Sequence, residues 1–194
     1  MEQLIFKLIF VAYAVGMGVI RRPFEKRNKN NTINLDKKDM IERVLLVFTF
    51  LGMSILPLVY ILTSWLNFAN YELPLPLGIL GVLLLGPTLY LYYRSHKDLG
   101  CNWSVSLEIR DAHTLTTNGV YRTIRHPMYS AIWLGNISQA LLLQNYIAGL
   151  SGLVGFGLLY FSRVKREEQM MESQFGDEYT SYKKKTKRLI PNFF

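Results

Sequence analysis

Cysteine is nearly missing from this chain, in which Cys101 is the only one among 194 residues. A single cysteine excludes an intrachain disulfide and a metal site built from several thiolates. Histidine is scarce too, with three residues and no acidic residues at ligand spacing, so we expect no metal centre. Acidic residues are outnumbered, 14 against 22 Lys and Arg, which gives a formal net charge of +8. A basic chain can bind nucleic acid, but no recognisable module for it is present, so we expect no nucleic-acid partner.

Apolar residues make up 50% of the chain and are gathered in long blocks with the charges between them. A soluble domain would instead spread them at helix or strand periods. Blocks of this length are typical of membrane spans. The expected spans are residues 4–20, 44–66, 75–93, 128–143 and 147–161. We therefore predict an all-α integral membrane protein with about five transmembrane helices and a C-terminal helical hairpin.

The first apolar block has a second interpretation. Lys7 and the short apolar stretch around it also fit a cleavable signal peptide. No small-x-small cleavage site precedes Arg21 and Arg22, which favours a span.

Lys and Arg are concentrated in three segments, with eight in residues 21–43, five in 94–125 and eight in 163–188. The connections 67–74 and 144–146 contain none. Positively charged loops stay in the cytoplasm. We therefore predict a multi-pass protein with its N-terminus outside and its C-terminus and active site cytoplasmic.

The same pattern predicts how the chain is organised. Residues 1–93 contain the first three spans and the basic cytoplasmic loop 21–43, and residues 94–194 form the functional core. The core consists of the cytosolic loop 94–126, the hairpin 127–161 and the cytosolic C-terminal helices 162–194. Four glycines in the hairpin superficially resemble a dinucleotide loop, but no strand precedes them, so we expect no Rossmann fold. Close helix packing in lipid explains them better.

The stretch 119–129 is dense in polar side chains and is followed at once by an apolar run. Pro127 suits the first turn of a helix, where its missing N–H would have no partner. Arg125 and His126 should then lie at the mouth of a membrane helix, whose N-terminus favours an anion.

Arg163 and Glu167 lie four residues apart on the helix that leaves the last apolar run, so they share one face. The pair can be a surface ion pair of little energy. A charge at the membrane boundary is also a candidate functional site. The helix should end at Gly176, and residues 177–187 should form a second amphipathic helix.

From about residue 113 onward the chain resembles the isoprenylcysteine carboxyl methyltransferase family, and in particular its short prokaryotic-type members. The matching residues are His113-Thr-Leu-Thr-Thr-Asn-Gly119-Val-Tyr121, Arg125-His126-Pro127-x-Tyr129, Arg163-x-x-x-Glu167-Glu168, Phe175-Gly176-x-x-Tyr179-x-x-Tyr182 and Pro191. Eukaryotic members carry further membrane helices before this core, so their recognition of prenylated proteins does not transfer with the motifs.

The resemblance implies a membrane O-methyltransferase that binds S-adenosyl-L-methionine in a cytosolic pocket and releases S-adenosyl-L-homocysteine. By this resemblance the cofactor would contact His113, Thr114, Leu115, Thr116, Tyr121, His126, Pro127, Met128, Tyr129 and Glu167. Arg163 would bind the acceptor, and Arg163 and Glu167 would form the catalytic pair. The expected acceptor is the carboxylate of a prenylated cysteine, or a similar lipidic carboxylate, that enters from the bilayer.

Three alternatives remain open at this point. A phospholipid amine N-methyltransferase would share the cofactor and the membrane, but it would need a general base and would have little use for Arg163. A sterol-type membrane reductase has similar C-terminal motifs and uses NADPH. A non-catalytic membrane scaffold would not need polar residues clustered so strongly on one side.

Overall fold

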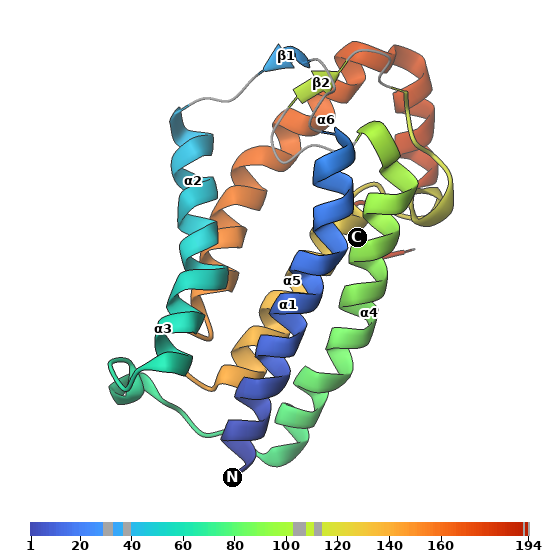
Figure 1. The fold of residues 1–194 in the computed structure, drawn as a ribbon. Coiled ribbons are helices and arrows are strands. Elements are labelled where there is room, and N and C mark those ends of the chain that lie inside the picture. The colour runs from blue at the N-terminus through green and yellow to red at the C-terminus, as the bar shows by residue number, and fades with distance from the viewer. Residues whose placement is uncertain (29–32, 37–39, 103–107, 111–113, 192, 194) are drawn as a thin grey trace.

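The structure is a computed structural model that describes residues 1–28, 33–36, 40–102, 108–110, 114–191 and 193. Its helices are α1 (Glu2–Asn28), α2 (Met40–Phe50), η1 (Leu51–Ile55), α3 (Leu56–Leu62), η2 (Asn67–Ala69), α4 (Leu75–Leu99), η3 (Gly100–Asn102), η4 (Gly119–Arg122), α5 (Pro127–Leu143) and α6 (Ser151–Lys185). Two short strands, β1 (Ile33–Asp36) and β2 (Glu108–Arg110), complete the described elements. The long helices run side by side as a bundle (Figure 1). The predicted helical membrane fold is confirmed.

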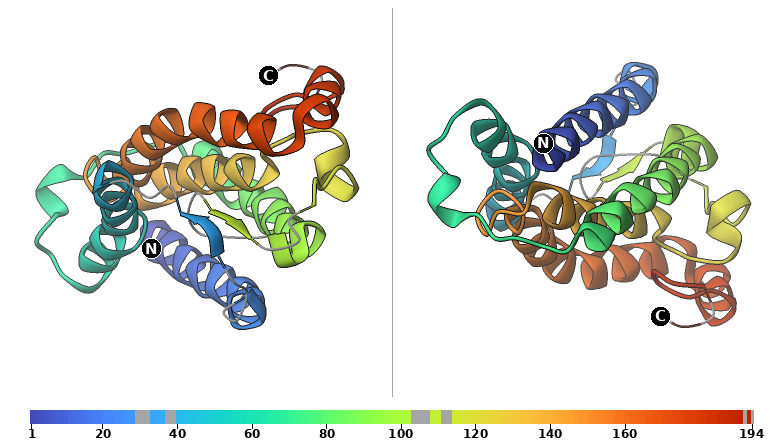
Figure 2. Two further views of the ribbon diagram at one scale, coloured as in Figure 1. Left: turned by 90° about the horizontal axis from the view of Figure 1, so that it is seen from above. Right: turned by 90° about the horizontal axis from the view of Figure 1, so that it is seen from below.

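Three helical runs are long and apolar enough to cross a membrane among the described residues: Glu2–Arg27, Met40–Leu62 and Leu75–Leu99. They coincide with the first three predicted spans. Helix α5 and the first half of α6 pack into the same bundle, with α5 between α4 and α6 (Figure 2). The 17 residues of α5 reach only about 26 Å at ~1.5 Å per residue. Because α5 is central, most of its circumference is buried, which explains why it is apolar nearly all round.

The two connections without Lys or Arg meet at the end of the bundle that carries the N-terminus (Figure 1). The Asn145 amide donates hydrogen bonds to Leu66 O (2.7 Å) and to Asn70 Oδ1 (2.9 Å). The backbone N–H of Tyr71 donates to Gln144 O. The second half of α6 lies at the opposite end of the bundle (Figure 1). The charge pattern therefore predicted correctly which segments lie at each end of the bundle. That the basic end faces the cytoplasm stays a prediction.

Helices α2 and α6 approach closely because small residues lie between them. A Cβ on Gly155 would come within 3.1 Å of Thr49 Cα, and the Thr49 hydroxyl donates to Gly155 O at 3.0 Å. Farther down the same seam, Gly52 lies in the π-helical turn η1, which precedes Pro57, and its carbonyl accepts hydrogen bonds from Gln139 and Ser151. Gly155 therefore serves helix packing, as the sequence predicted for the glycines of the hairpin.

The helices extend further beyond the apolar blocks than the sequence predicted. Helix α1 runs on to Asn28 and α4 to Leu99, so α4 passes through the proposed division at residues 93 and 94. Helix α2 begins at Met40, four residues before the predicted span 44–66, and residues 33–36 of the predicted loop form β1, which pairs antiparallel with β2. This sheet was not predicted, since its strands are short and far apart in sequence. The break at Gly176 was predicted correctly: its φ of +52° interrupts α6 at a kink.

Candidate active site

The start of α5 meets the middle of α6 at the basic end of the bundle. The Tyr129 hydroxyl donates a hydrogen bond to Glu167 Oε2, and Arg163 Nε lies 3.7 Å from the same oxygen. Arg163 is nearly buried, with a side chain only 9% exposed. The i, i+4 spacing therefore places the predicted pair on one face of α6, where Tyr129 also reaches it.

Arg163 has a second acidic neighbour, which the sequence did not single out. Glu42, in the first turn of α2, is fully buried, and its Oε1 lies 3.6 Å from Arg163 Nη1. One guanidinium is thus flanked by carboxylates from two helices. Both distances exceed the ~2.7–2.9 Å typical of a charge-assisted hydrogen bond, so neither ion pair is closed.

An aromatic cluster continues from these charges into the membrane. It lies where α2, α5 and α6 meet, and Tyr160 is one turn before Arg163 on α6. Rings of Tyr129, Trp133, Phe156 and Tyr160 pack edge to face, with centroids 5.2–5.9 Å apart. The arrangement joins a charged region to an apolar, aromatic cluster.

His126 stacks on Tyr129, with ring centroids 5.2 Å apart. One ring nitrogen, Nε2, lies 3.3 Å from Glu168 Oε1, and the other, Nδ1, lies 4.0 Å from Glu167 Oε1. The ring therefore faces two carboxylates of the protein itself, whereas the sequence suggested that a bound anion would lie here. Pro127 begins α5 as predicted, and the first N–H to close a helical turn is that of Ser130 onto His126 O.

Glu168 is the most heavily bonded carboxylate of this region. It accepts hydrogen bonds from Arg125 Nε (3.1 Å), Arg188 Nε (3.1 Å) and Arg188 Nη2 (2.6 Å). Its side chain is only 4% exposed. Burial by itself would raise the pKa of Glu168, but the hydrogen bonds from His126 and Arg188 and the charge of Arg125 hold it well below its usual range.

This pKa predicts how stability depends on pH. Because the folded-state pKa of Glu168 is depressed, its contribution is fully present above the ordinary Glu value of about 4.3 and is lost as the pH falls through the folded value. We expect thermal unfolding in detergent to shift to lower temperature as the pH falls below about 4. Glu168→Gln should have a lower Tm at pH 7 and a shallower loss in acid. Equal slopes for both proteins would contradict the assignment.

The segment before α5 is joined to the segment after α6 by a parallel β-bridge between Ile124 and Lys187. The backbone N–H groups of Arg125 and His126 donate to Lys187 O (2.8 Å) and Arg188 O (3.0 Å). Next along the chain, the Ser130 hydroxyl donates to Leu189 O at 2.6 Å. Two segments about 60 residues apart thus form one wall of the site.

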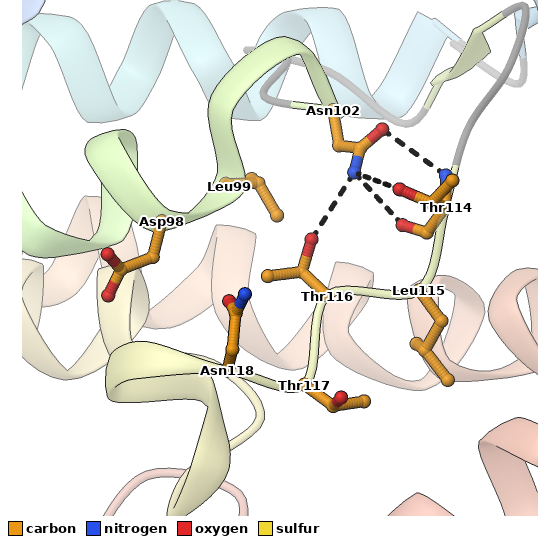
Figure 3. Close-up of a pocket in the computed structure, with 8 residues that line it drawn as sticks. All are labelled: Asp98, Leu99, Asn102, Thr114, Leu115, Thr116, Thr117 and Asn118. Atoms are coloured by element: carbon orange, nitrogen blue, oxygen red, sulfur yellow. Dashed lines mark hydrogen bonds between the residues drawn. The ribbon is translucent and has the colours of Figure 1, made fainter.

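A polar cavity of about 390 Å³ lies at the same end of the molecule, beside the end of α4. Its lining residues are Asp98, Leu99, Asn102, Thr114, Leu115, Thr116, Thr117 and Asn118. The Asn102 amide donates to Thr114 O (2.9 Å) and to the Thr116 hydroxyl (3.2 Å), as Figure 3 shows. Asn118 projects between Asp98 and Thr116 in the same view. The volume lies within the ~300–1,000 Å³ of small-molecule sites.

Gly119 ends the cavity loop in a conformation that requires glycine. Its φ is +57°, and a Cβ there would overlap the Asp98 carboxylate. That carboxylate accepts a hydrogen bond from the Val120 N–H at 3.0 Å, which fixes the start of η4. We expect Gly119→Ala to destabilise the protein by at least the ~1–2 kcal/mol of a left-handed L-residue.

Gly18 provides the control for this substitution. It lies in the interior of α1, and a Cβ there would meet no atom within 4 Å. Gly18→Ala should therefore stabilise the protein slightly, by up to about 1 kcal/mol, because alanine favours the helix. Thermal unfolding in detergent measures both changes, and a neutral Gly119→Ala would contradict the proposed strain.

Tyr121 lies between the cavity and the charged cluster of Glu42, Arg163 and Glu167. Its hydroxyl donates to Ser95 O at 3.4 Å, and its own carbonyl accepts a hydrogen bond from Tyr182 at 2.6 Å. Burial raises the pKa of Tyr121, and the nearby carboxylates of Glu167 and Asp98 raise it further. Tyr121 and Glu167 therefore lie at the same end of the bundle.

The predicted site residues thus fall into two adjoining groups. Thr114, Leu115 and Thr116 line the cavity, and His113 lies outside the described residues. The predicted residues at the start of α5, His126 to Tyr129, lie at the charged cluster with Arg163 and Glu167 of α6. Met128 is partly exposed there. Sequence reasoning missed Glu42, Asp98, Asn102, Asn118 and Arg188. Two of them carried a signal: Glu42 is a charge at the start of a span, and Asn118 stands within the motif 113–121 that carries the family resemblance.

Known proteins share the part of the chain that forms much of this site. The profile of the isoprenylcysteine carboxyl methyltransferase (ICMT) family matches residues 79–173, from the second turn of α4 to a point within α6. The matched residues make up about half of the chain. As in the sequence-based resemblance, the ICMT match includes Arg163, Glu167 and Glu168.

Named ICMT relatives and a solved structure agree with the profile. The Homo sapiens protein-S-isoprenylcysteine O-methyltransferase is 31% identical over 139 residues, which are 67% of this chain and 49% of that protein. The Schizosaccharomyces pombe enzyme is 32% identical over 114 residues, 58% of this chain and 48% of that protein. The eukaryotic intramembrane Ras methyltransferase ICMT has the same fold, with a TM-score of 0.51 at 23% identity over 98% of this chain and 71% of that one. The chain spans about half the length of the two relatives named first.

Proposed function

We propose that this chain is an S-adenosyl-L-methionine-dependent methyltransferase that esterifies the carboxylate of a lipidic acceptor such as a prenylated cysteine. The observation that carries the proposal is the position of Arg163. Its nearly buried guanidinium lies 3.6 and 3.7 Å from the carboxylates of Glu42 and Glu167, at the head of the aromatic cluster of α5 and α6. A ligand with an anionic head and a long apolar body matches this combination.

The polar cavity suits the cofactor. It combines a carboxylate, amides and hydroxyls with the apolar faces of Leu99 and Leu115, as a nucleoside joined to an amino acid requires. When bound, S-adenosyl-L-methionine supplies a methyl group activated by a sulfonium and leaves as S-adenosyl-L-homocysteine. Tyr121, between the cavity and Glu167, and Tyr129 would pack near the sulfonium, where aromatic faces suit a cation.

The start of α5 would contribute as a helix N-terminus. The N–H groups of Met128 and Tyr129 precede the first closed turn, so they could donate to the methionine carboxylate of the cofactor. Pro127 sets this geometry by fixing the first turn. Since both nitrogens of His126 face glutamates, its part in the proposal is to orient Glu167 and Glu168.

In this reaction the protein would mainly position the acceptor carboxylate against the methyl group. An acceptor carboxylate with a pKa near ~3.5 is ionised at pH 7 and needs no general base. Arg163 would bind it through paired N–H donors and aim one oxygen at the methyl group. Glu167, fixed by Tyr129, would hold the guanidinium in that orientation. Alignment of this kind can lower a barrier by roughly 7–11 kcal/mol.

The membrane supplies the acceptor. With the basic end of the bundle in the cytoplasm, the charged cluster would lie at the inner leaflet. The acceptor would enter sideways from the bilayer between α2 and the α5–α6 hairpin, with its prenyl chain along the aromatic cluster.

The test is methyl transfer by the purified protein in detergent. With labelled cofactor and a farnesylated cysteine, we expect a base-labile methyl ester, and S-adenosyl-L-homocysteine should raise the Tm. Label in phospholipid headgroups without ester formation would support an amine methyltransferase instead. Stabilisation by NADPH but not by S-adenosyl-L-homocysteine would support a reductase. Absence of the ester with every carboxylate acceptor would overturn the proposal.

A further inference from the structure

Three lysines at the end of α6 and just after it have no role in the function proposed so far. They are Lys184, Lys185 and Lys187, and all three side chains are exposed. Within the described part of the chain, none of their ammonium groups forms an ion pair or a hydrogen bond. The adjacent Lys183, by contrast, pairs with Glu172 at 2.7 Å. The three charges are therefore open to a partner from outside the chain.

Large apolar side chains follow these lysines and also point away from the protein. Ile190 is 53% exposed and Phe193 is 83% exposed. Leu189, which precedes them, instead packs against the aromatic cluster. The segment thus has one side that belongs to the protein and one that is apolar and outward-facing. Positive charges beside such side chains are typical of a segment that lies in the membrane interface.

The contacts of this segment give its depth in the membrane. The Ser130 hydroxyl, in the first turn of α5, donates to Leu189 O at 2.6 Å. Leu189 therefore lies level with the start of a helix that runs into the bundle. The chain after the kink in α6 turns back toward the bundle to reach this level (Figure 1). In the predicted topology Ile190 is then level with the hydrocarbon boundary, and Lys187 with the lipid headgroups.

We propose that the lysines and the two apolar side chains form a docking surface for anionic phospholipid of the surrounding bilayer. This surface, the tail surface, consists of Lys184, Lys185, Lys187, Ile190 and Phe193. The phosphate of the headgroup lies against the lysines, and the acyl chains lie against the apolar side chains. With the basic end of the bundle in the cytoplasm, the tail surface meets the leaflet whose surface potential is negative.

The tail surface is joined directly to a wall of the candidate active site. The carbonyls of Lys187 and Arg188 accept hydrogen bonds from the backbone N–H groups of Arg125 and His126. The Arg188 side chain also donates to Glu168 at 2.6 Å. A lipid that holds the lysines therefore holds the segment that carries Arg188 to the site. Anionic lipid should thus stabilise the folded protein and raise the rate of the proposed reaction.

Acidic residues of the same helix do not cancel these charges. Asp177 and Glu178 lie seven residues before Lys184 and Lys185, which is about 10 Å along a helix. That separation is about one Debye length at ~0.1 M salt, so the attraction is strongly screened. Each lysine near an anionic membrane surface strengthens binding about fivefold. The three lysines together therefore account for roughly a hundredfold.

The experiment follows thermal unfolding of the full chain in nonionic detergent micelles titrated with phosphatidylglycerol. For the wild type we expect the Tm to rise and saturate, which gives an apparent Kd for the lipid. High salt should weaken the effect, because exposed charges are screened. Lys184→Gln, Lys185→Gln and Lys187→Gln combined should raise the Kd at least tenfold. Phosphatidylcholine should bind more weakly, and glycerol phosphate, which has no acyl chains, should leave the Tm unchanged.

Two further variants make this result specific. Arg22→Gln, Lys26→Gln and Lys97→Gln combined remove the same charge from exposed positions on α1 and α4, which lie on the far side of α5 from the end of α6 (Figure 2). Their Kd should stay within about twofold of the wild-type value. Ile190→Ser with Phe193→Ser keeps every charge and should raise the Kd about fivefold or more. Equal losses in the two charge variants, or glycerol phosphate acting like the lipid, would overturn the tail surface.

The effect on rate rests on the proposed function, whereas the effect on Tm does not. It is measured in nanodiscs as the rate of ester formation with phosphatidylglycerol present, divided by the rate in phosphatidylcholine alone. We expect a ratio of about three or more for the wild type, and a ratio near one when the three lysines of the tail surface are replaced. A lipid-dependent Tm without methyl transfer to any acceptor would contradict the proposed function alone. Methyl transfer without a lipid-dependent Tm would contradict the tail surface alone.

Discussion

Replacing Arg163 by alanine is expected to lower kcat/KM for the lipidic carboxylate by about three orders of magnitude. Truncating one partner of a buried, hydrogen-bonded charge pair costs about 2–5 kcal/mol, and each 1.4 kcal/mol is a factor of ten. The substitution also removes the cation that lies 3.6 Å from Glu42 and 3.7 Å from Glu167. Initial rates of ester formation at several acceptor concentrations measure the effect.

Two further arginine variants make this result specific. Arg163→Lys keeps the charge but cannot bind a carboxylate through paired donors, so it should retain only part of the activity. Arg166 lies one turn farther along the same helix, where its Nε donates to Ser162 O at 3.1 Å. The kcat/KM of Arg166→Ala should stay within about threefold of the wild-type value. Full methyl transfer by Arg163→Ala would remove Arg163 from the site.

The second large effect concerns stability. Glu168→Ala should lower the free energy of unfolding by about 3–5 kcal/mol, because it leaves a group of buried or half-buried cations without their shared carboxylate. Arg125 and Arg188 lose direct hydrogen bonds, and Lys183 loses a neighbour at 3.8 Å. Thermal and denaturant unfolding in detergent measure the change.

Glu172 offers a matched control on the same helix. It pairs with Lys183 at 2.7 Å, but both side chains are more than a third exposed. Glu172→Ala should therefore cost at most about 1 kcal/mol. If the two glutamate variants lost the same stability, the buried network would not be what holds the end of α6 in place.

Glu167 and Glu168 are adjacent in one motif but contact different partners, and this limits what the sequence could predict. The i, i+4 spacing correctly paired Glu167 with Arg163. Neighbouring residues on a helix point about 100° apart, so Glu168 turns toward Arg125 and Arg188 instead. Those partners are 43 and 20 residues away, and no local pattern indicates them.

The length of the apolar runs predicted the spans, because a helix in lipid must pair its backbone N–H and C=O groups within itself. It could not predict where helices end in water, which is why the last turn of α4 was missed. That turn carries Asp98 to the cavity, opposite Asn118. Glu42 lies in the segment 21–43, which the sequence predicted to be a basic loop, and its burial follows from the α2–α6 contact.

The β-bridge between Ile124 and Lys187 has a consequence for biogenesis. Ser130 and its acceptor Leu189 are 59 positions apart, which at ~5–20 residues per second is a delay of about 3–12 s during translation. Helix α5 therefore reaches the bilayer well before the strand-like segment that completes its entrance. The nascent chain can insert into the membrane while its reaction centre is still unfinished.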